Sequence, residues 1–349
     1  MIRVRFAPSP TGSLHLGNAL SAAANRSFGD WLLLRIDDTD QARSVPGGEA
    51  AIVSDLGWLG ISWEDGPVRQ SERRDSHLAA VERLAELEDD DGALRWRGTT
   101  LVRADGSPTY QLATVVDDVD FGITHVVRGS DHRPNEPLHR ALTEALGAES
   151  PVFVHHGLVL GPHGGKLSKR DAHSSVADLR EEGLPGEAVR AYLDELGLPQ
   201  HDVQLDVARL RRLGIDAIAA MADEELAGRI DAPLSVVPAV RGARTLVEAR
   251  EFARQVLDPA PVELPAAAAP TLERFAELLV GAAPELDEGG ARELVRELKA
   301  VGGDLRALRQ ALTGAERGPE LWAVVIAIPS EEILRRLERA LAGSVRSGR

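Results

Sequence analysis

Strand-like apolar runs alternate with helix-like segments through roughly the first two hundred residues, and this alternation constrains the fold more than any other feature. Residues 2–7 (IRVRFA) alternate in polarity as a short strand does, and residues 31–37 (WLLLRID) form the continuous apolar run of a buried parallel strand. Residues 123–129 and 152–161 carry further strand patterns, and the apolar spacing from about His15 to Ser27 predicts a helix. The alternation predicts an α/β fold with a doubly wound parallel sheet.

The pattern changes near Gln200, after which nearly every segment has the periodicity of a helix. Residues 259–270 (PAPVELPAAAAP) are rich in proline and alanine, which is typical of a linker. We therefore predict an α/β domain over residues 1–195, a helical region over 196–258 and, after the linker, a helical domain over 271–349.

The composition excludes several classes of protein. No cysteine is present, which excludes thiol nucleophiles, disulfides and cysteine-ligated zinc. The N-terminus lacks the apolar core of a signal peptide and no apolar run is long enough to cross a bilayer, so we expect a cytoplasmic protein without a membrane segment. The formal net charge of −15 argues against nucleic-acid binding, but weakly, because a basic groove can lie on an acidic protein.

Residues 7–20 (APSPTGSLHLGNAL) place a tight turn between the first strand and the first helix. Free N–H groups at such a helix start point at an anion, Gly17 permits close approach of a ligand, and His15 adds a donor. An ordinary strand-turn-helix connection with a surface histidine explains the same letters. The chain contains neither a Walker A pattern nor G-x-G-x-x-G, so a nucleotide bound here uses neither common mode.

Residues 161–171 (GPHGGKLSKRD) form a glycine-rich stretch that carries several cations. Such a loop suits a lid that closes over a polyphosphate, with lysine as a mobile point charge. A solvated basic loop is the alternative interpretation. The cationic and polar residues in question are Lys166, Ser168, Lys169 and Arg170.

Together these two stretches resemble the paired motifs of class I aminoacyl-tRNA synthetases that are usually written HIGH and KMSKS. The stretches RFAPSPTGSLHLGNAL, LRIDDTD, LGWLGISWEDGPVRQSER, DGSPTYQLATVVDD, GITHVVRGSDH and LVLGPHGGKLSKR stand in the order found in glutamyl-tRNA synthetases. The resemblance covers nearly the whole chain, and it is strong over residues 3–195. It implies a Rossmann-like catalytic domain followed by stem-contacting and anticodon-binding helical regions.

The resemblance also implies roles for individual residues. Catalysis would involve His15, Gly17, Lys166 and Lys169. The implied ATP contacts are Ser9, Thr11, His15, Gly17, Asn18, Lys166, Leu167, Ser168, Lys169 and Arg170. The implied glutamate contacts are Arg5, Ala7, Ser9, Asp37, Tyr110, Thr114 and Arg128. A guanidinium fork suits a carboxylate and rejects the amide of glutamine.

The implied reaction needs no side-chain nucleophile. ATP and Mg²⁺ activate L-glutamate to an adenylate, and a hydroxyl of the terminal adenosine of tRNA(Glu) then takes up the glutamyl group. Positioning and charge stabilisation carry such catalysis. A monomer is the expectation for the family.

Three departures from the family pattern stand out. Asp37 replaces a glutamate that usually helps bind the amino group, and Thr114 stands where an asparagine is common. The insertion that usually grips the tRNA acceptor end is shortened to about residues 74–106, where one amphipathic helix and an acidic run from Glu88 to Asp91 are expected. Within it, residues 95–97 (RWR) are the candidates for stacking and phosphate contact.

These departures leave alternatives open. The chain could be a tRNA-independent or non-discriminating glutamate-activating ligase, or an inactive paralogue that serves as a binding protein. It could also be a glutamyl-queuosine-tRNA(Asp) synthetase, although such enzymes usually lack the anticodon-binding part and carry a cysteine-ligated zinc. We expect no metal at His155 and His156, because adjacent strand residues point to opposite faces. Asp117 and Asp118 could form an acid/base pair, but we expect capping or salt bridging from them instead.

Overall fold

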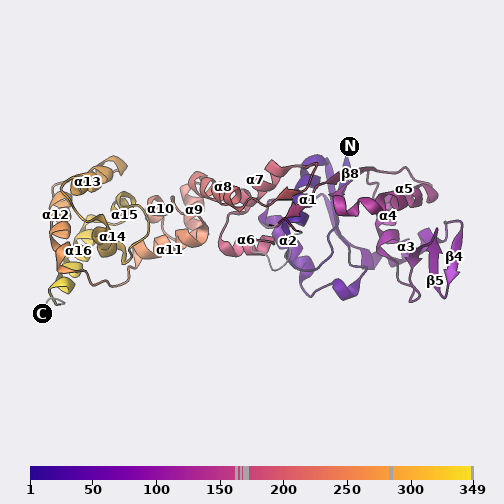
Figure 1. The fold of residues 1–349 in the computed structure, drawn as a ribbon, viewed down its shortest axis with the longest axis horizontal. Helices are drawn as coiled ribbons and strands as arrows, with labels where there is room; N and C mark the ends of the chain where they lie inside the picture. Colours follow the sequence, from indigo (N-terminus) through magenta and orange to yellow (C-terminus); the bar gives the residue numbers. More distant parts are fainter. Residues whose placement is uncertain (162–163, 166, 168–172, 283–285, 347–349) are drawn as a thin grey trace. The chain divides into compact units, whose positions relative to one another are not determined.

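The computed structural model describes residues 1–161, 164, 165, 167, 173–282 and 286–346. The chain divides into two compact units, which are described separately (Figure 1). The first unit comprises Met1–Glu181 and Gly186–Leu210, and the second comprises Glu182–Pro185 and Arg211–Arg349.

A parallel sheet forms the centre of the first unit. Strand β1 (Arg3–Phe6) pairs with β2 (Trp31–Ile36), which pairs with β3 (Asp65–Arg69), and β7 (His125–Gly129) pairs with β8 (Val152–His156). The two pieces meet where β7 lies beside β1, since Thr124 N–H donates to the Arg3 carbonyl at 3.0 Å. The resulting order β3-β2-β1-β7-β8 confirms the predicted α/β fold with parallel strands.

Helices pack on this sheet and connect its strands. They are α1 (Leu16–Phe28), α2 (Gly48–Trp58), α4 (Tyr110–Asp120), α5 (Glu136–Ala145), α6 (Val176–Glu182) and α7 (Gly186–Leu196). Helix α1 begins within one residue of its predicted start, and its apolar face is buried against β1, β2 and β7. Asn25 of α1 donates to the Val127 carbonyl at 3.1 Å, so the helix is fixed to the sheet by a polar contact as well.

The strand predicted over residues 152–161 is interrupted at Gly157. Strand β8 ends at His156, and a separate β9 (Val159–Leu160) pairs with β10 (Val203–Gln204). A Cβ at Gly157 would collide with the backbone of His201, so only glycine permits this close approach of two chain segments. The apolar pattern is continuous in the sequence, but tertiary packing divides the segment into two strands.

Residues 74–106 contain more β structure than we predicted. Helix α3 (Arg74–Val81) stops early, and β4 (Leu87–Asp90), β5 (Ala93–Trp96) and β6 (Thr99–Val102) form an antiparallel sheet beside it (Figure 1). Trp96 is 1% exposed and packs with apolar side chains of α3, β6, α4 and α5. Burial of this indole outweighs the helical periodicity of the preceding segment, so the acidic run becomes part of an edge strand.

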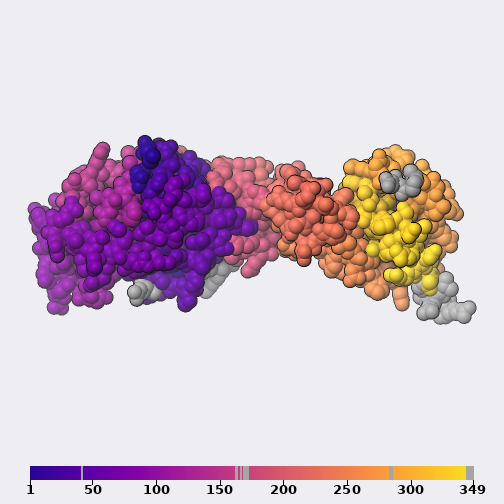
Figure 2. Space-filling view, turned by 180° about the vertical axis from the view of Figure 1, so that it is seen from behind, coloured from indigo at the N-terminus to yellow at the C-terminus, as the bar shows by residue number. Residues whose placement is uncertain are grey.

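The second unit is built from helices. They are α8 (Val207–Ala220, from Arg211 on), α9 (Asp223–Ile230), α10 (Val237–Val240), α11 (Leu246–Leu257), α12 (Ala269–Val280), α13 (Glu288–Ala300), α14 (Leu305–Thr313), α15 (Leu321–Ala327) and α16 (Ser330–Arg346). One apolar cluster runs through them, with Phe275 fully buried inside it. On α16, Arg336 donates to the Leu312 carbonyl at the end of α14 at 2.7 Å, which places a cation at a helix C-terminus. The space-filling view shows the yellow C-terminal residues on the surface of this unit (Figure 2).

Residues 259–270, which have the composition of a linker, contribute to this core. Leu264 is 2% exposed and Ala268 is 3% exposed, and both belong to the apolar cluster of the second unit. Helix α12 already begins at Ala269. Proline and alanine enrichment therefore accompanies a packed segment here.

This packing generates a prediction about stability. Leu264→Ala should lower the free energy of unfolding by about 2–4 kcal/mol, because it removes buried methyl groups and leaves a cavity. Leu257→Ala is the matched control, since Leu257 is 49% exposed. Urea denaturation of both variants measures the difference, and equal, near-zero effects would show that residues 259–270 do not support the core.

Candidate functional site

A buried arginine links β2 to α4 beneath the candidate site. Arg35 is fully buried, and its Nε donates to Asp37 Oδ1 at 2.8 Å while Nη1 donates to Asp118 Oδ1 at 2.7 Å. Arg5 of β1 adds a contact from its Nε to Asp118 at 3.2 Å. Burial opposes the charged form of Asp118, but Arg5 and Arg35 together hold its pKa below the ordinary range. The predicted salt bridging of Asp118 is confirmed.

Asp117 makes a second set of contacts on the other side of α4. Its carboxylate accepts from Arg73 Nε at 2.7 Å, contacts His77 Nε2 at 2.8 Å and accepts from Gln70 Nε2 at 2.9 Å. Burial acts against ionisation, yet these partners and Arg35 lower the pKa of Asp117. The adjacent carboxylates of α4 thus share Arg35, and in addition Asp117 binds Arg73 while Asp118 binds Arg5, so both are engaged in salt bridges.

Asp37 lies at the end of β2, where the parallel strands present their carboxyl ends. Its carboxylate is held by Arg35, and burial raises its pKa against that attraction. The Asp37 N–H donates to the Pro8 carbonyl at 3.0 Å, and Thr11 N–H donates to the Ser9 carbonyl at 2.8 Å. The turn after β1, with half-buried Ala7 and Ser9, is therefore tied directly to the end of β2.

Arg128 lies at the end of β7, and it has fewer charged partners than Arg5 and Arg35 among the described residues. Its Nε donates to His155 Nε2 at 3.3 Å, and its Nη1 contacts His139 Nδ1 at 3.4 Å. Its Nη2 is buried and has no hydrogen-bond partner among the described residues. Burial and the nearby charge of Arg5 lower the pKa of Arg128.

Tyr110 and Thr114 lie one turn apart on α4, on the face directed toward these arginines. Burial raises the pKa of the Tyr110 hydroxyl, and the charges of Asp37, Arg5 and Arg128 all act on it. Thr114 is fully buried, and its Oγ1 has no partner among the described residues. The structure thus brings the predicted glutamate contacts from β1, β2, α4 and β7 to one end of the sheet.

The start of α1 lies at the same end of the sheet. Ser13 Oγ and Leu14 N–H both donate to Asp55 Oδ2 of α2, at 2.7 and 2.8 Å, which fixes the turn before the helix. Within the first helical turn, the N–H groups of Gly17 and Asn18 have no acceptor among the described residues. A Cβ at Gly17 would meet open space, so a ligand can approach this backbone closely.

His15 is the N-cap residue of α1, and it lies beside the segment that follows the predicted lid. Leu16 N–H donates to the Ser174 carbonyl at 3.0 Å, and His15 forms a β-bridge with Ser175. The His15 Nδ1 atom is buried without a partner among the described residues. The described residues that follow the predicted lid, Ser174 and Ser175, therefore lie at the helix start.

Several predicted ATP contacts of that lid lie outside the described residues. They are Lys166, Ser168, Lys169 and Arg170. Leu167 is described and half-buried, and Thr11 is half-buried in the turn after β1.

The structure corrects one part of the prediction for the acceptor end of tRNA. Trp96 is buried, and its Nε1 donates to the Ala85 carbonyl at 3.1 Å, so its ring is not available for stacking on a base. Arg97 stacks on that ring at 4.4 Å and Arg95 pairs with Asp90 at 2.9 Å. Arg95 and Trp96 belong to β5, and Arg97 lies in the turn between β5 and β6.

Sequence reasoning missed the residues that support Arg128 and the α4 face. The importance of Arg35 could have been inferred from the sequence, because an arginine inside the apolar run WLLLRID requires buried acidic partners. His139 and His155 gave no comparable signal, since their importance depends on the side chain that reaches them from another strand.

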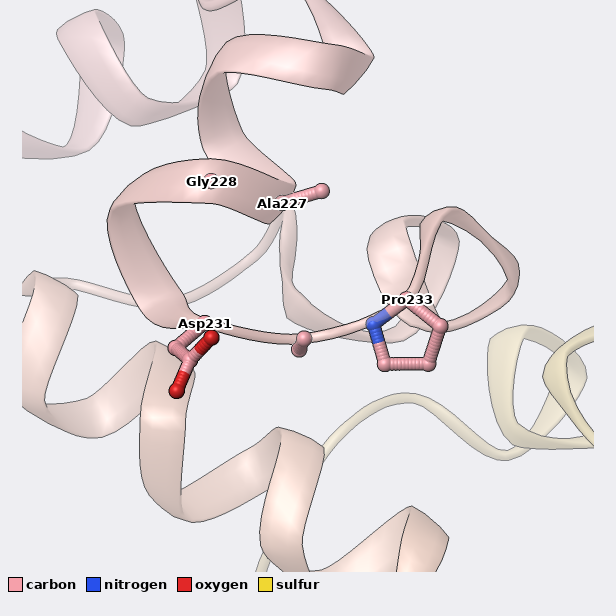
Figure 3. A pocket seen from close by; sticks show the side chains of 5 residues that line it. Ala227, Gly228, Asp231 and Pro233 are labelled. Carbon is pink, nitrogen blue, oxygen red and sulfur yellow. The ribbon is translucent and has the colours of Figure 1, made fainter.

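The second unit contains a pocket, but none of the predicted site residues lines it. A hollow of about 360 Å³ in the second unit is lined by Ala227, Gly228, Asp231, Ala232 and Pro233 (Figure 3). No group of three or more acidic or histidine side chains in the described part of the chain is arranged to hold a metal ion.

Known proteins resemble this chain over most of its length. Residues 1–88 and 94–211 match the family described as tRNA synthetases class I (E and Q), catalytic domain. The chain belongs to this family of class I tRNA synthetases. Within residues 1–211 the match is interrupted over residues 89–93, which comprise the end of β4, the turn and the first residue of β5.

Relatives within the family carry a more specific name. Glutamate–tRNA ligase 1 of Rubrobacter xylanophilus is 35% identical, over 99% of this chain and 99% of that protein. Glutamate–tRNA ligase of Akkermansia muciniphila is 31% identical, over 97% of this chain and 98% of that protein. The crystal structure of a glutamate tRNA ligase from Elizabethkingia meningosepticum in complex with its amino acid has a TM-score of 0.78 at 22% identity, over 98% and 99%, and shows the same fold.

The alignment with the Rubrobacter relative runs over 433 positions, whereas this chain has 349 residues. That relative therefore contains stretches that this chain lacks. Among the described residues, none of the helices combines the length and the apolar character needed to cross a bilayer.

The histidines around Arg128 generate a prediction about pH. Burial and the charge of Arg128 lower the pKa of His155 to about 4 and that of His139 to about 3, from 6.5. Between pH 6.5 and about 4 the unfolded chain binds these protons and the folded chain does not, so acidification should lower the free energy of unfolding. His155→Gln removes one such group, and its urea-denaturation stability should fall less steeply over this window; identical slopes for variant and wild type would contradict the prediction.

Proposed function

We propose that this chain is a glutamate–tRNA ligase that activates L-glutamate with ATP and transfers it to tRNA(Glu). The observation that carries the proposal is the buried Arg128 Nη2, a cationic donor without a partner among the described residues, at the sheet end where α1 begins. A carboxylate ligand supplies the missing acceptor, and the free N–H groups of the helix start suit phosphate. Relatives with this name align with 99% and 97% of the chain.

In the first step, an α-carboxylate oxygen of glutamate attacks the α-phosphorus of ATP. The new oxygen–phosphorus bond forms as the bond to the leaving pyrophosphate breaks, and no protein nucleophile takes part. We assign the side-chain carboxylate to Arg128 and Arg5, with Tyr110 and Thr114 beside it. Asp37 is a shorter acid than the family pattern has, and we assign it to the amino group.

The residues of α1 hold the nucleotide in this proposal. Gly17 and Asn18 offer backbone N–H groups to the phosphates, and His15 adds its ring at the same helix end. Lys166 and Lys169 reach the phosphates from the lid and stabilise charge on the departing pyrophosphate. Mg²⁺ would enter with the phosphates of ATP and supply further charge neutralisation.

In the second step, a hydroxyl of the terminal adenosine of tRNA attacks the carbonyl carbon of the adenylate and AMP departs. We assign the stem and anticodon contacts to the helical regions over residues 196–258 and 271–349. The short insertion carries the acidic edge strand β4, so the acceptor end must be held mainly by other parts of the chain. We also propose that the enzyme acts as a cytoplasmic monomer.

The direct test is aminoacylation of matched tRNA(Glu) with labelled glutamate. Charging of tRNA(Glu) supports the proposal, and a parallel reaction with tRNA(Gln) tests for a non-discriminating enzyme. Activation of glutamate without transfer to any tRNA would favour a tRNA-independent ligase. Charging of tRNA(Asp) alone would favour a queuosine-modifying enzyme.

Removal of the unpaired cation should abolish recognition of the substrate side chain. Arg128→Leu should lower kcat/KM for glutamate by roughly 100-fold or more, because a buried charge-assisted pair is lost. Arg26→Leu is the matched control, since Arg26 pairs with Glu64 at the surface. Unchanged kcat/KM in the Arg128 variant would remove this residue from the site.

The lid lysine should act on the transition state. Lys169→Ala should lower the rate of adenylate formation by at least roughly 100-fold while glutamate affinity changes little, because the charge it stabilises develops as pyrophosphate leaves. Single-turnover kinetics and equilibrium binding of glutamate separate these effects. Equal losses in both would mean that Lys169 contributes only to ground-state binding.

A further inference from the structure

Arg128 is held by histidines, and this distinguishes it from the other buried arginines of the site. Arg35 has three carboxylates within 3.7 Å, and Arg5 has Asp118 at 3.2 Å. Among the described residues, no carboxylate forms a salt bridge with Arg128. Its contacts are imidazole nitrogens from two elements, His155 on β8 and His139 on α5.

The neighbours of each histidine determine which nitrogen accepts from Arg128. His139 Nε2 lies 2.6 Å from Gln111 Oε1, and Gln111 Nε2 donates to Asn135 Oδ1 at 3.3 Å, so His139 Nε2 carries the proton. This leaves His139 Nδ1 as an acceptor for Arg128. On β8, His155 Nδ1 faces Glu136 at 3.5 Å, which leaves Nε2 as the acceptor for the Arg128 Nε–H.

Both imidazoles are enclosed. His139 is 2% exposed and the His155 side chain is 3% exposed, and Phe153 lies on the Arg128 guanidinium at 5.1 Å. A carboxylate in either place would neutralise Arg128 within the protein, as Asp118 does for Arg5. Neutral acceptors fix the guanidinium plane but leave its charge available.

We propose that His139 and His155 are positioning residues that orient Arg128 through neutral acceptors and thereby make the site select a carboxylate side chain over a carboxamide. This inference rests on the proposed function and adds a source of glutamate specificity to it. A bound carboxylate accepts a hydrogen bond from the buried Arg128 Nη2 and balances the positive charge of Arg128. Glutamine offers a weaker neutral acceptor and brings an amide N–H toward a donor.

The test compares three substitutions at position 139 in the full-length enzyme charging tRNA. His139→Glu places a carboxylate against Arg128 and should lower kcat/KM for glutamate roughly 100-fold, mainly through KM. The value for glutamine should change less than about threefold, so that the glutamate/glutamine ratio falls at least tenfold. His139→Leu removes the acceptor and should raise KM for glutamate about tenfold, whereas His139→Gln keeps a neutral acceptor and should restore KM to within about threefold.

His125→Glu is the matched control, because His125 lies at the opposite end of β7 and contacts Phe28 and Thr124. It should leave the glutamate/glutamine ratio unchanged, and the KM for ATP should stay constant throughout the series. An unchanged ratio in a folded His139→Glu enzyme, or failure of His139→Gln to restore KM, would overturn the inference. A wild-type enzyme that charges no glutamate would instead contradict the proposed function, and calorimetric binding of glutamate and glutamine would then test the inference by the same ratio.

Glutamate binding to the wild-type protein gives a measurement that does not depend on a variant folding. Other charged and titratable groups act on Arg128 or on these histidines from neighbouring elements: Arg5, Tyr110, Asp118, His132, Arg133 and Glu136. Because neither His139 nor His155 takes up a proton above about pH 5, the Kd for glutamate should show no inflection near pH 6.5 that depends on them. An inflection there that disappears in His139→Gln would mean that His139 binds Arg128 in a different protonation state and would overturn the inference.

Discussion

The buried charge of Arg35 is the constraint on which the catalytic unit depends. A guanidinium without exposure to water is costly unless carboxylates and hydrogen bonds surround it. Asp37 lies just past the end of β2, and Asp117 and Asp118 reach Arg35 from α4, so compensation of one charge fixes the helix against the sheet. Tyr110 and Thr114 lie on that same helix, and their positions at the candidate site follow from this attachment. Loss of one partner from such a buried cluster typically costs about 3–5 kcal/mol.

The same cluster distinguishes arginines that are paired with carboxylates of the protein from an arginine whose charge can pair with a ligand. Asp118 pairs with Arg5 and Arg35, while the hydrogen-bond partners of Arg128 on β7 among the described residues are imidazoles. At the candidate site, Arg5 is therefore already paired with a carboxylate of the protein, whereas Arg128 can pair with a bound anion. The proposed phosphate end is built differently, from backbone N–H groups at the start of α1, which suit an anion without a buried side-chain charge.

Sequence periodicity predicted the elements that carry the site, and these predictions held for β1, β2, β7 and α1. It was less successful where packing between distant segments decides the outcome. Residues 76–88 have helical spacing, but the chain leaves the helix after Val81 because Trp96 and its strand partners bury more surface as a sheet. Residues 259–270 have the composition of a linker, yet Leu264 inserts into the core of the second unit.

The letters of the chain alone determined the strand and helix order, the glycine and histidine at the helix start and the cation-rich loop, because these depend on spacing along the backbone. They also indicated Arg5 and Arg128 as carboxylate-binding residues through resemblance to a family. Only the tertiary structure decided that Arg5 is paired and Arg128 is not, and that histidines from α5 and β8 hold the latter. The reason is physical: the charge that a side chain offers to a ligand depends on which partners reach it in space, and those partners here are contributed by different strands and helices.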